Sequence, residues 1–231
     1  LNGQAQIQRE GNPWTFDHPT SIKAATFISL PLAPLNWEDE VNDSQPQGLK
    51  PFLFAWPVDT LIAIPEAKNK IFEDENTQVY QLLIEAKEAY SINAIFSTFK
   101  LPAGAKLFLY NPERTVVVGA LSAHNNKSDK RLATSPIPGS TLIMELVIDK
   151  NNCEYTPELV IGRLSLDQKD VFGKRSRFGR SGDCNVDINC PPGADWQIIK
   201  RSVCRFIRGG TWWCSGALIN NTANDGRALV L

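Results

Sequence analysis

The sequence predicts a mostly β protein, and three observations lead to this prediction. Apolar residues alternate with polar ones along several short runs, the runs lie about ten residues apart, and proline and glycine stand between them. This spacing, found over residues 14–166, is typical of an antiparallel β-sandwich. The chain has 231 residues, of which 42% are hydrophobic and 21% charged, so it has room for one large or two ordinary domains.

The first clear strands are expected in the middle of this region. Residues 80–96 alternate, but Leu82, Ala86 and Ala89 also fit a helical stripe. The turn signal at residues 101–104, Leu-Pro-Ala-Gly, follows directly. Proline and glycine at such a position favour strands that are joined by turns. We therefore expect strands here and not a helix.

Further strands are expected between later turn signals. Residues 106–110 precede Asn111-Pro112, and the β-branched residues 115–118 lead into Gly119. After the turn at residues 136–139, an apolar face alternates with a mixed face. The apolar face consists of Leu142, Met144, Leu146 and Ile148, and the mixed face of Ile143, Glu145, Val147 and Asp149. This pattern predicts a strand that packs more on one side than on the other.

The last twenty residues predict a hairpin. Residues 212–219 favour a buried strand, in which Gly216 marks the close approach of another backbone or a disulfide. Asparagine, aspartate and glycine within residues 220–226 favour a loop, and residues 228–231 favour a second strand. The hairpin is either the beginning of a larger domain that is truncated here or the end of a small β-domain.

Two segments at this end carry a resemblance to a known family. CSGALINNTAND and the upstream SGDCNVDINCPPGADW resemble the start of the mature domain of lysyl-endopeptidase-type serine peptidases, a bacterial branch with the trypsin-like (chymotrypsin-like) fold. The resemblance implies that residues 181–231 begin such a peptidase domain, as an incomplete first barrel that stops before the catalytic histidine. It implies no catalytic residue within this chain.

The N-terminal region resembles the β-sandwich segment that precedes such peptidase domains. The matching pieces are residues 99–107, residues 119–125 and the Pro138-Gly139-Ser140 turn leading to Glu145. The resemblance implies a jelly-roll-like pro-region or accessory domain over residues 1–172.

Between the two regions lies a short basic segment, residues 173–180. It contains Lys174, Arg175, Arg177 and Arg180. Exposed, flexible segments are where proteolytic nicking concentrates, and a peptidase specific for Lys or Arg would find several sites here. One interpretation is a processing linker between pro-region and mature domain; the other is a solvated basic loop that binds nothing.

The five cysteines leave at least one thiol without an internal partner. The resemblance implies that Cys184, Cys190 and Cys214 pair with cysteines later in the peptidase domain. Cys153 and Cys204 lie outside that pattern. They could pair with each other or stay free as small buried side chains.

Other candidate chemistry is weak. His18 and His124 lie in polar, turn-like settings without a second ligand at metal-ligand spacing. Ser215 is not in a nucleophile elbow and is interpreted as structural. The acidic runs 38–40 and 73–75 could bind calcium or be solvated loops. We expect no metal and no cofactor.

Charge and hydropathy narrow the partner classes. The formal net charge of -1 gives no electrostatic footprint for nucleic acid, and Lys200, Arg201, Arg205 and Arg208 suit a barrel strand better than a nucleic-acid stripe. No apolar run is long enough to span a bilayer. The chain starts with Leu1 and shows no signal segment. Either a leader was removed or the sequence is a fragment at this end too, and both alternatives are compatible with export.

The sequence therefore predicts the N-terminal part of a secreted serine endopeptidase precursor. Its partners would be protein or peptide substrates, cleaved after Lys or Arg, and its oligomeric state stays open. The alternative is a secreted β-sandwich binding or adhesion module with a degenerate, inactive peptidase remnant.

Overall fold

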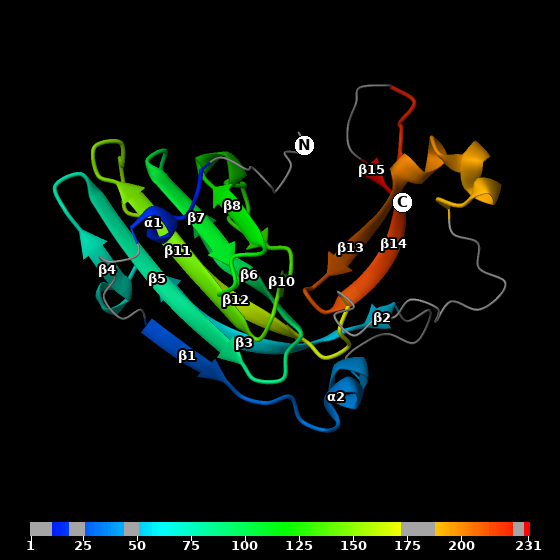
Figure 1. The fold of residues 1–231 in the computed structure, drawn as a ribbon, viewed down its shortest axis with the longest axis horizontal. Coiled ribbons are helices and arrows are strands. Elements are labelled where there is room, and N and C mark those ends of the chain that lie inside the picture. Colours follow the sequence, from blue (N-terminus) through cyan, green and yellow to red (C-terminus); the bar gives the residue numbers. More distant parts are fainter. Residues whose placement is uncertain (1–10, 19–25, 44–50, 172–187, 224–228) are drawn as a thin grey trace.

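The computed structural model describes residues 11–18, 26–43, 51–171, 188–223 and 229–231. Of these residues, 49% lie in strands and 14% in helices, and none of the sheets they form closes into a barrel. The prediction of a mostly β protein is confirmed. Figure 1 shows two sheets facing each other and a third sheet beside them.

The first sheet has the order β1-β5-β11-β7-β8, with β4 also paired to β5. Its strands are β1 (Thr26–Leu30), β4 (Lys70–Glu73), β5 (Thr77–Ala86), β7 (Ala105–Tyr110), β8 (Val117–Leu121) and β11 (Thr141–Asp149). All pairs are antiparallel except β1 with β5, which is parallel. The expected antiparallel arrangement thus has one exception, at the edge of this sheet.

The second sheet has the order β10-β6-β12-β3, with β9 also paired to β6. It contains β3 (Ala55–Ile64), β6 (Ser91–Lys100), β9 (Leu132–Ala133), β10 (Ile137–Pro138) and β12 (Glu158–Asp167). The third sheet combines β13 (Val203–Arg208), β14 (Trp212–Ile219) and β15 (Leu229–Val230) with β2 (Phe52–Leu53).

The main core lies between the first two sheets. The apolar face predicted for residues 142–148 is buried there, with Leu142, Met144, Leu146 and Ile148 all nearly inaccessible to solvent. Residues 80–96 form parts of β5 and β6. The prediction of strands, made from the turn signal at residues 101–104, is therefore confirmed over the alternative of a helix. In that turn the Ala105 N–H donates to the Pro102 carbonyl at 3.1 Å.

The helices are short. They are α1 (Trp14–Asp17), α2 (Trp37–Asp43) and the 3₁₀ turns η1 (Ala67–Asn69), η2 (Ala123–Asn125), η3 (Pro191–Trp196) and η4 (Ile199–Ser202). The acidic run 38–40, expected in a loop, lies in the first turn of α2. Carboxylates there interact favourably with the positive end of the helix dipole.

A buried carboxylate fixes α1 on the outer face of the first sheet. Glu145 of β11, on the face predicted to be mixed, is 0% exposed. It accepts hydrogen bonds from the Thr15 backbone N–H (3.1 Å), the Thr15 hydroxyl (2.5 Å), Tyr110 Oη (2.8 Å) and Gln81 Nε2 (3.3 Å). Phe16 packs edge-on against the Tyr110 ring, with 5.0 Å between centroids.

Burial also affects Tyr110 itself. Desolvation, and then the charge of Glu145, raise the pKa of the Tyr110 phenol well above its usual value. The phenol therefore stays protonated and keeps its proton available for donation to Glu145. The outer face of β11 is therefore a second packing surface, polar at Glu145 and apolar at Ile143 and Val147.

Candidate functional site

The C-terminal unit, by which we mean the described residues from 188 onward, is built on a hairpin. β13 and β14 pair along all of β13, and Gly209, Gly210 and Thr211 join them. The two glycines have φ angles of 60° and 81°, in the left-handed region that glycine enters without Cβ strain. β15 pairs with Leu218 and Ile219 of β14. The two predicted strands are confirmed as β14 and β15, while residues 224–228 between them, which include part of the predicted loop, lie outside the described residues.

Gly216 of β14 lies next to Val230 and Leu231. A Cβ atom at Gly216 would lie 2.9 Å from the Leu231 carbonyl oxygen and 2.8 Å from Val230 Cγ1. Ala217 and Leu231 exchange two backbone hydrogen bonds of 3.0 Å. The close backbone approach expected at this glycine is therefore present.

Only the first half of β14 is well covered. Trp212 is 4% exposed, whereas Leu218 and Ile219 are 46% and 42% exposed. The expectation of a fully buried strand is wrong for this second half. Large apolar side chains are also exposed elsewhere in the unit, namely Trp196, Ile198, Ile199, Val203, Phe206 and Val230.

The covered half of β14 is joined to the sandwich by strand addition. β2 pairs antiparallel with β14 through Leu53↔Trp212 and Phe52↔Trp213. The Phe54 N–H then donates to the Thr211 carbonyl at 3.0 Å. Because β3 of the second sheet begins at Ala55, the segment 52–64 contributes to two sheets in succession, with residues 52–53 in the third sheet and residues 55–64 in the second (Figure 1).

The turn of the hairpin lies against the outer face of the second sheet. Asn93 of β6 donates from Nδ2 to the Gly210 carbonyl at 2.9 Å. Asn93 and Ser165 of β12 are directly opposite in the sheet, and both are buried. A Cβ atom at Gly210 would lie 2.5 Å from Ser165 Oγ and 3.0 Å from Asn93 Oδ1. No local pattern in the sequence indicates this pair, because only strand pairing brings residues 93 and 165 together.

An aromatic cluster completes the contact. Trp212 packs with Trp37 of α2 and Leu53 of β2 in a small buried cluster. Trp213 lies against the fully buried Phe54, with 5.3 Å between ring centroids. Lys169 forms an ion pair with Glu38 of α2 and lies over the Trp37 ring, which ties α2 to the residues that follow β12.

This hairpin falls inside a segment that matches a known family. Residues 178–231 match the family model described as lysyl endopeptidase, C-terminal domain. The chain is thus similar to lysyl endopeptidases in its C-terminal part. No solved structure matches the chain significantly. The lysyl-endopeptidase-like segment includes the strands β13 to β15 and the Gly210 turn, so the contacts described above join this segment to the sandwich.

Several predicted site residues lie outside the described part of the chain. They are the four basic residues of the proposed linker, Lys174, Arg175, Arg177 and Arg180, together with Cys184. Cys190 is exposed, Cys214 is half-buried, and neither forms a disulfide with another described cysteine. Cys153 and Cys204 are also free, so of the two alternatives for this pair the structure has the unpaired one. Cys153 donates to the Tyr155 carbonyl.

The two histidines do not approach Ser215. His18 stacks on Trp14 with ring centroids 4.2 Å apart, and its Nδ1 lies 2.9 Å from the Trp14 carbonyl. His124 lies exposed in η2. Ser215 is an exposed residue of β14, and within the described ranges no hydrogen bond joins it to a histidine. The described residues thus do not bring either histidine to Ser215, and the interpretation of all three as non-catalytic stays a prediction.

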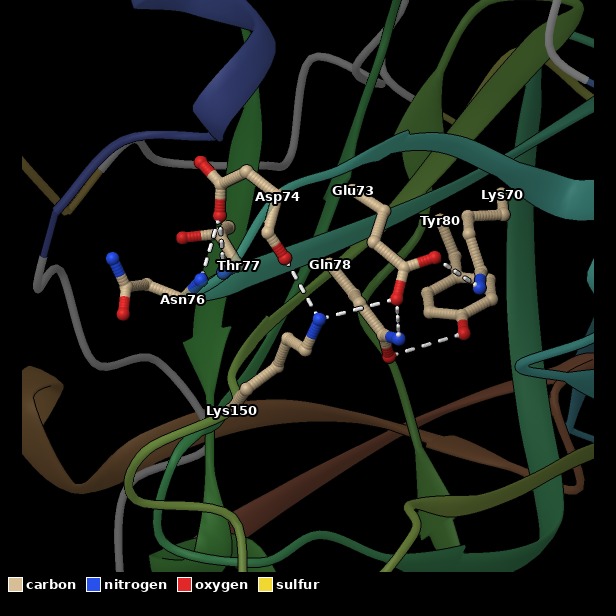
Figure 2. A network of polar contacts seen from close by, with 8 residues as sticks. All are labelled: Lys70, Glu73, Asp74, Asn76, Thr77, Gln78, Tyr80 and Lys150. Carbon is tan, nitrogen blue, oxygen red and sulfur yellow. Dashed lines mark hydrogen bonds and ion pairs between the residues drawn. The ribbon is translucent and has the colours of Figure 1, made fainter.

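Glu73 and Asp74 of the acidic run 73–75 belong to a network of polar contacts (Figure 2). Glu73 accepts hydrogen bonds from Lys70 Nζ (2.7 Å), Gln78 Nε2 (2.5 Å) and Lys150 Nζ (3.2 Å). Asp74 Oδ1 accepts from two backbone N–H groups of the turn before β5. Both carboxylates are thus engaged by protein donors, which favours a structural role over a calcium site.

The Glu73 network predicts an acid-sensitive contact. Hydrogen bonds from Lys70, Gln78 and Lys150 lower the pKa of Glu73 to about 2 from 4.5. Because the folded-state pKa is depressed, the stabilisation is complete above pH 4.5 and is lost as the pH falls towards 2. In Lys70→Met, we expect the Glu73 carboxyl to titrate closer to 4.5. Carboxyl NMR titration measures this, and an unchanged midpoint would contradict the assignment of Lys70 as the main cause.

None of the described helices is both long and apolar enough to cross a bilayer. The described structure is β-rich, and residues 178–231 are similar to the C-terminal domain of lysyl endopeptidases.

Proposed function

We propose that this chain is part of a secreted serine endopeptidase precursor that cleaves peptide bonds after Lys or Arg. Residues 1–172 would be the pro-region or accessory domain, residues 173–180 the processing linker and residues 181–231 the start of the peptidase domain. The observation that carries the proposal is the lysyl endopeptidase match over residues 178–231, on a segment that folds as a strand hairpin.

The chemistry would be acyl transfer to water. Such an enzyme needs a serine nucleophile, a base that deprotonates it, a carboxylate that orients the base and an oxyanion hole. In the resembled family the catalytic histidine follows the first hairpin, so the proposal assigns these groups to sequence after Leu231. His18, His124 and Ser215 have no catalytic part in it.

The burial pattern supports the proposed division of the chain. The sandwich encloses a large core in which residues from both sheets are almost fully buried. The C-terminal unit instead exposes Val203, Phe206, Leu218 and Ile219 on its strands. By the strand register, Val203 and Ile219 lie on one face of the hairpin and Phe206 and Leu218 on the other, and further elements of a peptidase barrel would cover them.

The sequence of the gene beyond residue 231 and an activity assay test the proposal. We expect residues 1–231 alone to give no hydrolysis of lysyl or arginyl esters, because the triad is not among their side chains. The full-length precursor is expected to hydrolyse these esters after processing, and a serine-directed inhibitor should abolish this turnover. Turnover by residues 1–231 that is sensitive to the inhibitor would refute the assignment of residues 181–231.

The same assay distinguishes the peptidase from the alternative function, a binding or adhesion module. A binding or adhesion module with an inactive remnant predicts no catalytic histidine downstream and no ester hydrolysis by the full-length protein. Either finding would end the peptidase proposal for this chain while leaving its family relationship intact.

A further inference from the structure

We propose that the outer face of the second sheet is a docking surface for the β13–β14 hairpin, and that it holds the hairpin after the linker is cut. The assignment of residues 173–180 as a linker rests on the function proposed above. The docking itself rests on contacts within the described residues. The occupant of this docking surface is therefore the β13–β14 hairpin, which belongs to the lysyl-endopeptidase-like segment of the same polypeptide.

The first contact is a strand addition. β14 accepts the two residues of β2 as an edge partner, and the Phe54 N–H extends the ladder to Thr211. Backbone pairing of this kind gives affinity in β-augmentation, while side-chain pockets give specificity. Here the pocket is the Trp37–Leu53–Trp212 cluster.

The second contact fixes the turn. Asn93 donates to the Gly210 carbonyl, and a Cβ atom at Gly210 would force the side chains of Ser165 and Asn93 to move away from the turn. Ser165 is 1% exposed, and its hydroxyl has no hydrogen-bond partner among the described residues. Buried polar groups on an outer sheet face are protected from water only while the hairpin covers them. The fit depends on the absence of a Cβ atom at residue 210.

Gly209 provides a matched control for this contact. Both glycines have positive φ angles, so alanine causes backbone strain at either position. A Cβ atom at Gly209 would meet nothing within 4 Å, whereas one at Gly210 would meet the second sheet. The difference between Gly209→Ala and Gly210→Ala therefore isolates the docking contact from the strain of the turn.

Hydrogen exchange on the full chain tests the docking. In Gly210→Ala, we expect peptides that contain residues 52–56 and 210–214 to exchange about tenfold faster than in the wild type, since local opening frees these amides. Peptides from β11 should be unchanged. Gly209→Ala should show a much smaller change, and Asn93→Ala, which alters only the sandwich side, should show the same regions affected. Equal effects of the two glycine variants, or no effect of either, would overturn the proposal.

A second measurement tests retention. A recognition sequence for a site-specific protease is placed within residues 173–180, the chain is cut to completion as judged on a denaturing gel, and the product is passed through a native sizing column. We expect the two pieces to elute together in the wild type and in Gly209→Ala, and to separate in Gly210→Ala. Separation of the wild-type pieces would refute retention.

Failure of the docking proposal and failure of the proposed peptidase function give different results. Co-elution together with an inactive full-length protein would keep the docking surface and remove the peptidase. Separation together with an active full-length enzyme would keep the peptidase and remove the docking surface.

Discussion

Replacing Trp212 with alanine is expected to lower the free energy of unfolding by about 3–5 kcal/mol, the usual cost of truncating a buried tryptophan. Trp212 is 4% exposed and packs on Trp37 and Leu53. The variant would leave a cavity at the point where β14 meets β2. The loss in free energy of unfolding would be smaller if the surrounding side chains collapse into this cavity and larger if they do not. Urea denaturation followed by far-ultraviolet circular dichroism measures the change.

Trp196→Ala is the matched control for this prediction. Trp196 belongs to the same C-terminal unit but is 54% exposed, and exposed substitutions usually change stability by no more than about 0.5 kcal/mol. A loss in Trp196→Ala as large as that in Trp212→Ala would show that the effect does not come from the contact with the sandwich.

Replacing Glu145 with leucine is expected to lower the free energy of unfolding by about 3 kcal/mol. The Thr15 N–H and the Tyr110 hydroxyl would lose their acceptor in a buried site, whereas Gln81 Nε2 keeps Tyr110 Oη as an acceptor at 3.0 Å. Each unsatisfied buried donor costs about 1–3 kcal/mol. The Thr15 hydroxyl can still turn to Tyr110, which lies 3.0 Å away. Hydrogen exchange of residues 14–17 should accelerate with the loss of stability, because Thr15 anchors α1.

Glu145→Gln separates hydrogen bonding from charge. The hydroxyls of Thr15 and Tyr110 can rotate to accept from the new amide, so we expect a loss of only about 1 kcal/mol. Glu75→Gln, at an exposed carboxylate in the turn after β4, serves as the surface control and should be neutral. A glutamine variant as unstable as the leucine variant would contradict this account and indicate that the charge itself is required.

Local signals in the sequence were sufficient for about half of the strands of the sandwich, namely β5, β6, β7, β8 and β11, whereas β1, β3, β4, β9, β10 and β12 were not predicted. Alternation placed the buried face of β11 correctly, and the proline and glycine turns decided residues 80–96 in favour of strands. The same reasoning located β14 with the bounds found in the structure. These signals depend on residues a few positions apart, which strand geometry and turn chemistry constrain directly.

Contacts between distant segments were not predictable in the same way. Glu145 is buried because α1, 130 residues earlier, covers it. The Asn93–Ser165 pair and the β2–β14 ladder arise from sheet order, which alternation does not encode. The acidic start of α2 looked like a loop because seven residues are too few for a helical period to stand out against polar composition.

The shared segment from Phe52 to Ile64 has a consequence for how the protein can be divided. A boundary drawn at the basic linker separates the polypeptide after residue 172, but the edge of β14 is covered by residues from the other side of that boundary. A peptidase fragment expressed without the sandwich would present an open strand edge next to exposed apolar side chains, the combination that promotes edge-to-edge aggregation. Soluble production of that fragment would therefore depend on a substitute for the two residues of β2.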